Sequence, residues 1–196
     1  MFEINSYSGD AARPFLSEIA RLRIAVFREF PYLYEGSMHY EMEYLSNYYS
    51  SEKSLLVTVK EDIAIIGIST AAPLAEADPE FQEPIVSAGI DPGKILYFGE
   101  SVLLPEFRGK GIGHRFFDLR EQWAVRWGFP VTAFCAVSRP PGHPLEPKDH
   151  RLLDSFWKSR GYRKRDDLVV KLTWREIGGS KPDTDHDLIY WLREAP

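Results

Sequence analysis

The sequence is short of several residues that would point to particular classes of protein. It contains one cysteine, Cys135, in 196 residues, so no internal disulfide can form, and such scarcity is typical of a reducing compartment. The N-terminus lacks a basic stretch followed by an apolar one, and no uninterrupted apolar run is long enough to cross a bilayer. We therefore expect a cytoplasmic protein without a membrane partner.

Positive charge is also in the minority. The chain has 24 Lys and Arg against 29 Asp and Glu, which gives a net charge of −5 and a pI near 5.6. This balance provides no general attraction to nucleic acid, so no nucleic-acid partner is expected. Hydrophobic residues make up 44% of the chain, enough to fill a core, and the length suits a single domain over residues 1–196.

Hydrophobic periodicity and turn residues predict strands that alternate with helices, hence an α/β protein with a mixed sheet. Strands are predicted over residues 1–8, 54–60, 63–73, 94–104, 130–137, 168–174 and 187–193. Helices are predicted over residues 10–30, 111–127 and 149–161, with shorter ones within 32–50 and 76–93. Residues 176–196 are expected to provide the strand that closes the domain at its C-terminus.

One short segment combines glycine with positive charge. It reads LLPEFRGKGIGHRFF and lies between a strand-like and a helix-like run. Its glycines are Gly109, Gly111 and Gly113, and Arg108, Lys110 and His114 add basic side chains beside them. Main-chain N–H groups here would lie at a helix N-terminus, where the first donors lack partners and the helix dipole is positive. Such a place binds phosphate, so the segment is interpreted as a pyrophosphate site.

Three known phosphate-binding loops can be compared with this segment. A Walker A loop fails, because Gly111 follows Lys110 and no Ser or Thr stands beside it. The dinucleotide fingerprint fails by one residue, because position 114 is histidine. RGKGIG does match [RQ]-x-x-G-x-[GA], the pyrophosphate motif of the GNAT superfamily of acyl-CoA N-acyltransferases. The longer blocks ESVLLPEFRGKGIG and FWKSRGYRK also resemble that family, in the family's order, over about residues 1–175.

This resemblance implies a fold and a reaction. The fold would be one GNAT-type domain with a mixed, mostly antiparallel sheet of about six or seven strands, splayed in the middle and flanked by about four helices. The reaction would be direct transfer of an acetyl group from the co-substrate acetyl-CoA to an amine on a small molecule or a peptide. No metal is expected: His143 and His150 lie in a proline-rich loop without a clear third ligand.

The resemblance also assigns cofactor-binding positions. Main-chain groups of Val102, Leu103 and Leu104 would pair with the pantetheine arm. An N–H near Leu103 would also polarise the thioester carbonyl. The remaining predicted contacts to the cofactor are Arg108, Gly109, Lys110, Gly111, Ile112, Gly113, His114, His150 and Trp157.

The acceptor amine must lose a proton before it attacks, because an alkyl ammonium has a pKa of about 10. Glu100 is the candidate base, since it precedes the cofactor edge by two residues and shares a face with Val102. The alternatives are Glu35, Glu43 and His150.

Two positions depart from the family pattern. Trp157 stands where many members have a tyrosine that protonates the CoA thiolate, and indole is not an acid in water. Either another group serves, such as Cys135 or Tyr162, or the thiolate leaves unassisted. His150 stands where the family often has an asparagine. These departures keep open an alternative function: a catalytically weak or inactive protein that binds or senses acetyl-CoA.

The acceptor side is expected in residues 29–49, which hold four Glu, six Tyr and no Lys or Arg. Such residues attract a cation, so Tyr32, Tyr34 and Glu35 are predicted to bind the acceptor. An equally weighted interpretation is an amphipathic helix packed on the core. A third possible function is an interaction module that binds a partner through this surface. Residues 76–93 and 138–147 are expected to shape the same mouth, and a homodimer is a further possibility.

Overall fold

The computed structural model describes residues 2–48, 51–178 and 183–194. The strands are β1 (Glu3–Tyr7), β2 (Leu55–Glu61), β3 (Ala64–Pro73), β4 (Ile95–Tyr97), β5 (Ser101–Leu103), β6 (Val131–Val137), β7 (Arg163–Trp174) and β8 (Thr184–Glu194). The α-helices are α1 (Leu16–Phe27), α2 (Met38–Tyr48), α3 (Pro79–Ser87), α4 (Ile112–Trp127) and α5 (Asp154–Ser159). Residue 49 of the predicted acceptor segment lies outside the described residues, as do residues 179–182 and 195–196 of the predicted C-terminal segment.

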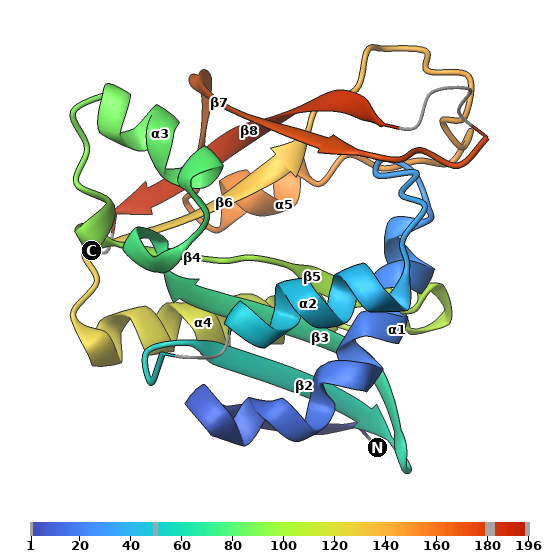
Figure 1. Cartoon of the computed structure of the whole chain (residues 1–196), viewed down its shortest axis with the longest axis horizontal. Helices are drawn as coiled ribbons and strands as arrows, with labels where there is room; N and C mark the ends of the chain where they lie inside the picture. Colours follow the sequence, from blue (N-terminus) through green and yellow to red (C-terminus); the bar gives the residue numbers. More distant parts are fainter. Residues whose placement is uncertain (1, 49–50, 179–182, 195–196) are drawn as a thin grey trace.

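The strands form one mixed sheet with helices on both faces (Figure 1). The order is β1-β2-β3-β4-β6-β8-β7, and β5 pairs with β3. Only the β4–β6 pair is parallel among these described pairs. The last strand along the chain, β8, therefore lies inside the sheet between β6 and β7. In the described part of the chain, no helix is both long and apolar enough to span a membrane.

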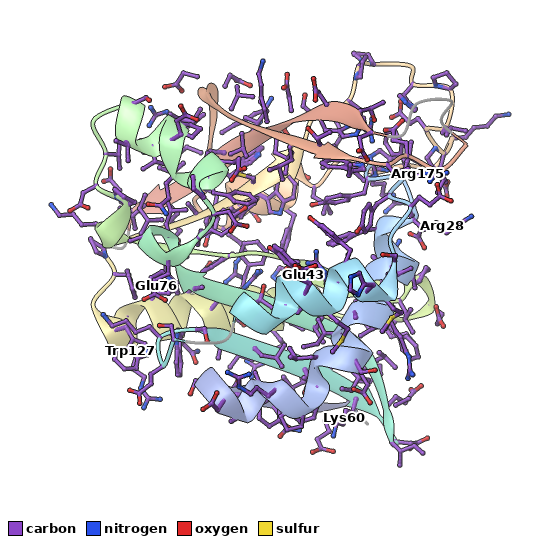
Figure 2. All side chains as sticks on the ribbon, viewed as in Figure 1. Arg28, Glu43, Lys60, Glu76, Trp127 and Arg175 are labelled. Atoms are coloured by element: carbon purple, nitrogen blue, oxygen red, sulfur yellow. The ribbon has the colours of Figure 1, made fainter. Side chains whose placement is uncertain are left out.

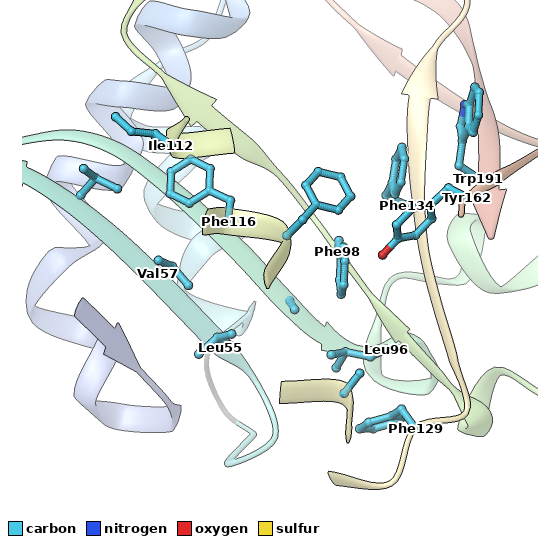
Figure 3. Packing of buried hydrophobic residues seen from close by; sticks show 14 of the residues in the cluster. Leu55, Val57, Leu96, Phe98, Ile112, Phe116, Phe129, Phe134, Tyr162 and Trp191 are labelled. Atoms are coloured by element: carbon cyan, nitrogen blue, oxygen red, sulfur yellow. The ribbon is translucent and has the colours of Figure 1, made fainter. Parts of the chain in front are cut away.

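Alternation of side chains along the strands divides the core into two layers. Leu55 and Val57 of β2 belong to the layer that contains Phe116 of α4 (Figure 3). Leu56, which lies between them in the sequence, packs instead with Ile19 of α1. The α1–α2 pair and α4 thus cover opposite faces of the same strands.

The strand predicted over residues 94–104 is broken by a β-bulge. Pairing with β3 is one residue out of register across the break, so residues 70–71 of β3 lie opposite residues 98–100. Phe98 points into the α4 layer. In an unbroken strand, alternation would place Glu100 on that same face. The extra residue instead turns Glu100 toward α1, and this decides which side of the sheet receives the carboxylate.

The predicted fold class, α/β with a mixed and mostly antiparallel sheet, is confirmed. Among the described residues the sheet has eight strands rather than six or seven, since the bulge divides one of them. The helix predicted over 10–30 starts as a 3-10 helix, because Pro14 cannot donate an N–H and its ring crowds the preceding turn. The helix predicted over 149–161 is shorter, because Leu152 and Leu153 are exposed and provide no buried face.

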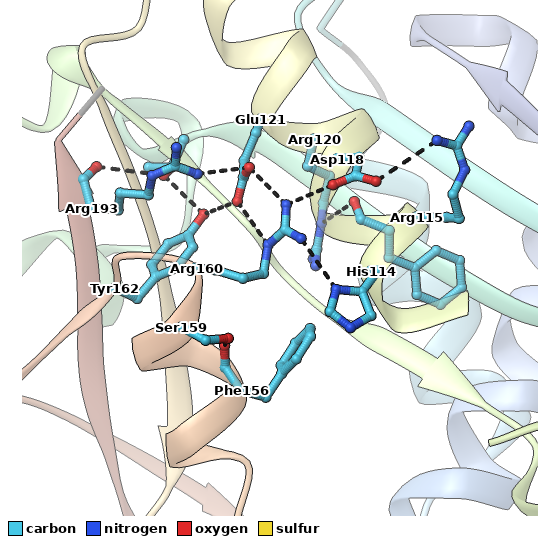
Figure 4. A network of polar contacts seen from close by, with 12 residues as sticks. His114, Arg115, Asp118, Arg120, Glu121, Phe156, Ser159, Arg160, Tyr162 and Arg193 are labelled. Carbon is cyan, nitrogen blue, oxygen red and sulfur yellow. Dashed lines mark hydrogen bonds and ion pairs between the residues drawn. The ribbon is translucent and has the colours of Figure 1, made fainter. Parts of the chain in front are cut away.

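A polar network fixes α5 beside α4 (Figure 4). Arg160, just after α5, bonds Asp118 and Glu121 of α4 at 2.8 Å each. Arg193 of β8 pairs with Glu121 at 2.7 Å, and the Tyr162 hydroxyl donates to Glu121 at 3.3 Å. The short helix therefore has a defined place next to the start of β7, despite its length.

Candidate active site

The glycine segment forms an open turn in front of α4. Gly109 and Gly111 have left-handed φ angles of 76° and 81°, which residues with a side chain adopt only with strain. The N–H groups of residues 109–113 have no main-chain acceptor among the described residues. A Cβ added at either glycine would meet no heavy atom within 4 Å. Main-chain donors that lack an acceptor in the described part of the chain thus lie in an uncrowded turn at the positive end of a helix.

Next to this turn, β5 and β6 diverge. The parallel pairing of β4 with β6 ends at Tyr97 and Ala133, and the Phe98 N–H donates to the Ala133 carbonyl at 2.7 Å. Beyond that point β5 continues beside β3 while β6 continues beside β8 (Figure 1). The bulge at residues 98–100 stands where the two strands separate.

One edge of β5 offers main-chain groups to a ligand. The Leu104 N–H donates to the Ile66 carbonyl at 3.0 Å, so this residue bonds toward β3. Alternation in an antiparallel ladder turns Val102 toward β3 as well, and it turns the N–H and C=O groups of Ser101 and Leu103 to the opposite edge. Of the three residues predicted to pair with pantetheine, Leu103 is the one whose main chain faces the gap between the diverging strands β5 and β6.

Aromatic rings hold two of the basic side chains at the turn. The Lys110 ammonium lies 4.9 Å from the centre of the Phe107 ring, a cation–π distance. The His114 ring packs edge-on against Phe156 of α5, with 4.9 Å between the ring centres. Both side chains are exposed; Lys110 lies within the turn and His114 in the first turn of α4.

The two residues that depart from the family pattern occupy different surroundings. Trp157 of α5 packs against Phe134 and Trp191, with ring centres 5.0 Å apart in both cases. It thereby lines the sheet face next to the diverging part of β6. His150 packs edge-on against Phe30, just after α1, at 4.8 Å. The structure therefore places Trp157 by the gap and His150 by the acceptor-side segment.

Glu100 belongs to a buried ion cluster that the sequence did not predict. Its carboxylate accepts a hydrogen bond from Arg23 of α1 at 2.5 Å, and the same guanidinium pairs with Glu41 of α2. Arg23 and Glu100 are each 8% exposed and Glu41 is fully buried. The candidate base therefore shares one arginine with a second carboxylate. Glu43, an alternative base, is exposed on α2 instead (Figure 2).

Aromatic rings surround this cluster. The Arg23 guanidinium lies 5.0 Å from the centre of the Phe27 ring and 4.9 Å from that of Tyr44. Burial opposes its charge, but Glu100 and the neighbouring groups outweigh that cost and raise the pKa of Arg23 well above its ordinary value. Burial raises the pKa of Tyr32, stacked on Phe27, to about 12. Glu41 and Tyr44, which belong to the segment expected to attract a cationic acceptor, thus already contact a cation of the protein.

The segment predicted to contact the acceptor is attached to the end of β7. The Tyr32 carbonyl accepts hydrogen bonds from Trp174 at 3.0 Å and from Arg139 at 2.9 Å. The Glu35 carboxylate pairs with Arg175 at 2.6 Å. These contacts bring the α1–α2 connection and the C-terminal half of the sheet together on one side of the gap. Burial raises the pKa of Tyr34, and the negative charge of Glu41 on α2 raises it further.

Neither of the proposed proton donors for the thiolate is acidified by its surroundings. Burial raises the pKa of the Cys135 thiol, although hydrogen bonds from Tyr97 and Tyr190 work against the shift. Burial likewise raises the pKa of Tyr162, whose hydroxyl lies 3.0 Å from that of Thr132. An unassisted departure of the thiolate therefore fits these side chains better than protonation by either group.

Comparison with known proteins identifies the family. A family model described as the acetyltransferase (GNAT) family matches residues 19–150, whereas no curated protein sequence matches the chain significantly. One similar structure is a ribosomal-protein-alanine N-acetyltransferase from Brucella melitensis, with 11% identity, a TM-score of 0.62 and coverage of 98% of this chain and 99% of that one. Another is an N-acetyltransferase from Staphylococcus aureus Mu50, with 12% identity, a TM-score of 0.61 and coverage of 99% and 98%. A third is the PaiA N-acetyltransferase from Thermoplasma acidophilum in complex with coenzyme A, with 14% identity, a TM-score of 0.54 and coverage of 100% and 99%. The chain belongs to the acetyltransferase (GNAT) family and is an acyltransferase.

Proposed function

We propose that this protein transfers an acetyl group from acetyl-CoA to an amine by direct attack in a ternary complex. The observation that carries the proposal is the row of N–H groups at residues 109–113, for which the described part of the chain provides no main-chain acceptor. The row ends at the second residue of α4 and adjoins the free edge of β5. These donors would hold the pyrophosphate. The edge at Leu103 would pair with the pantetheine arm, and the thioester would then reach the point where β5 and β6 separate.

The proposed reaction assigns roles to residues on both sides of the gap. The amine nitrogen attacks the thioester carbon, and the Leu103 N–H donates to the oxygen that becomes negative. The carbon–sulfur bond breaks and CoA leaves as a thiolate, which a thiol pKa of about 8.5 permits. The amine proton passes to Glu100 through water. Arg23 keeps that carboxylate in position on the α1 side of the sheet.

Cofactor binding is tested by unfolding with and without acetyl-CoA. A ligand bound at one site and present at about 100 times its dissociation constant adds roughly 2.7 kcal/mol to the free energy of unfolding. We expect a stabilisation of that size, visible as a higher melting temperature in a thermal scan. Desulfo-CoA should stabilise similarly, because it keeps the pyrophosphate. Unchanged melting at millimolar acetyl-CoA would refute the proposed site.

The role of Glu100 is tested with the substitution Glu100→Gln. We expect turnover with a responsive amine to fall by about 100-fold or more, since general base catalysis contributes at least that factor. Release of CoA is followed with a thiol reagent. Glu41→Gln is the matched control, because it removes a carboxylate from the same arginine on the α2 side. Equal rates for Glu100→Gln and wild type would remove the assignment.

A second candidate function is a protein that binds acetyl-CoA and turns it over slowly or not at all. Trp157 favours it, because an indole in the tyrosine position cannot donate a proton to the thiolate. The raised pKa values of Cys135 and Tyr162 point the same way. Normal binding without CoA release from any amine of a broad panel would favour this second candidate over the first.

A further inference from the structure

Arg108 touches both the cofactor side and the acceptor side of the candidate site. Its Nε donates to the Leu103 carbonyl at 3.1 Å, and this carbonyl lies on the free edge of β5. Its terminal nitrogen pairs with the Glu29 carboxylate at 2.8 Å. The side chains of Arg108 and Glu29 are 46% and 40% exposed, so a ligand can reach the pair. One guanidinium thus covers the edge that the pantetheine arm would need.

Glu29 begins the turn that leads from α1 to the acceptor-side segment. Its own N–H donates to the Val26 carbonyl at 3.1 Å. Its carbonyl accepts from the Leu33 N–H at 2.9 Å, which closes the turn that contains Tyr32. A change in the contacts of the Glu29 side chain is therefore expected to affect the first residues of the acceptor-side segment 29–49, which packs against Arg23 and β7.

We propose that Arg108 is a positioning residue that couples cofactor binding to the acceptor side, an inference that rests on the proposed function. A pyrophosphate at residues 109–113 brings two ionised phosphates next to Arg108, and a guanidinium binds phosphate strongly. The half-exposed carboxylate of Glu29 holds it only weakly. The guanidinium moves to the phosphates, frees the Leu103 carbonyl for an amide N–H of pantetheine, and releases Glu29.

The proposal predicts that breaking the Arg108–Glu29 pair strengthens the binding of acetyl-CoA, and a titration of acetyl-CoA can detect this. Glu29→Gln removes the competitor for Arg108 and should lower the dissociation constant of acetyl-CoA about two- to five-fold, the range that an exposed pair supports. Glu106→Gln is the matched control, because it removes the same charge from an exposed residue two positions before Arg108. This control should change the constant clearly less. In an Arg108→Gln background, where binding is weaker, adding Glu29→Gln should have no effect.

The outcomes separate this inference from the function on which it rests. Equal dissociation constants for Glu29→Gln and Glu106→Gln, or the same gain from Glu29→Gln with and without Arg108, would overturn the coupling while acetyl-CoA binding stands. A weaker affinity in Glu29→Gln would also overturn it, since a purely structural pair would lose affinity when broken. A wild-type protein that binds no acetyl-CoA would overturn the proposed function and the coupling together.

Discussion

Replacing Arg23 with methionine is expected to lower the free energy of unfolding by about 3–5 kcal/mol, the usual cost of leaving a buried charge without its partner. Two carboxylates depend on this guanidinium, Glu41 and Glu100, and both are almost completely buried. Methionine is long enough to fill much of the space, so the loss comes from charge rather than from volume. Urea unfolding monitored by tryptophan fluorescence measures the change.

Three comparisons isolate the charge effect. Arg21→Met makes the same change two residues earlier on the exposed face of α1, and it should alter stability by no more than about 0.5 kcal/mol. Lower pH should restore part of the loss in Arg23→Met, because protonation removes the uncompensated negative charge. Adding Glu41→Gln and Glu100→Gln should restore stability at neutral pH. A loss that is the same at all pH values would contradict the ion-cluster account.

The sequence predicted the elements whose signal is local. Periods of three and four placed α4, and its Gly128 ends the helix with a left-handed φ of 72°. Short apolar runs separated by turn residues placed β2 and β3. The turn in front of α4 was predicted from Gly109 and Gly111, because their missing side chains and the helix dipole act at the same place. Such features depend on neighbours in the chain, which a sequence displays directly.

The bulge and the free edge of β5 depend on pairing between distant strands. Apart from Gly99, residues 98–100 carry no signal of a bulge. A single glycine does not distinguish a bulge from an ordinary strand end. The register with β3, which decides that Glu100 faces α1, is set by contacts some thirty residues apart along the chain. The direction of the Leu103 main chain follows from that register as well. The sequence therefore predicted pantetheine contacts for Val102, Leu103 and Leu104, although only the main chain of Leu103 faces the gap.

The sequence does carry a signal for the buried arginine. Arg23 stands four residues after Ile19 and four before Phe27, within the apolar stripe of α1, and a charge at such spacing points into the core. Arg120 of α4 follows Phe116 by the same interval and is also buried; it donates to the Glu100 carbonyl at 3.2 Å. Charged residues within an apolar stripe need a buried partner, so both positions indicated a polar feature beneath the helices.

Replacing Gly113 with aspartate should separate cofactor binding from stability. Gly113 lies at the second position of α4, and a Cβ there would meet no heavy atom within 4 Å. Aspartate in the first turn of a helix complements the helix dipole, so the free energy of unfolding should stay the same or rise slightly. Its carboxylate would stand among the N–H donors of residues 109–113, where the pyrophosphate is proposed to bind. Affinity for acetyl-CoA should fall by about 100-fold or more.

Asparagine at the same position supplies the matched control, because it has nearly the same shape as aspartate without the charge. Calorimetric titration of both variants should show that Gly113→Asn keeps most of the affinity that Gly113→Asp loses. Equal losses would mean that bulk at Gly113, and not repulsion, prevents binding. Wild-type affinity in Gly113→Asp would place the phosphates elsewhere. A variant that folds at least as well as the natural protein and yet rejects its cofactor would tie binding to these donors, because lost stability could not explain the result.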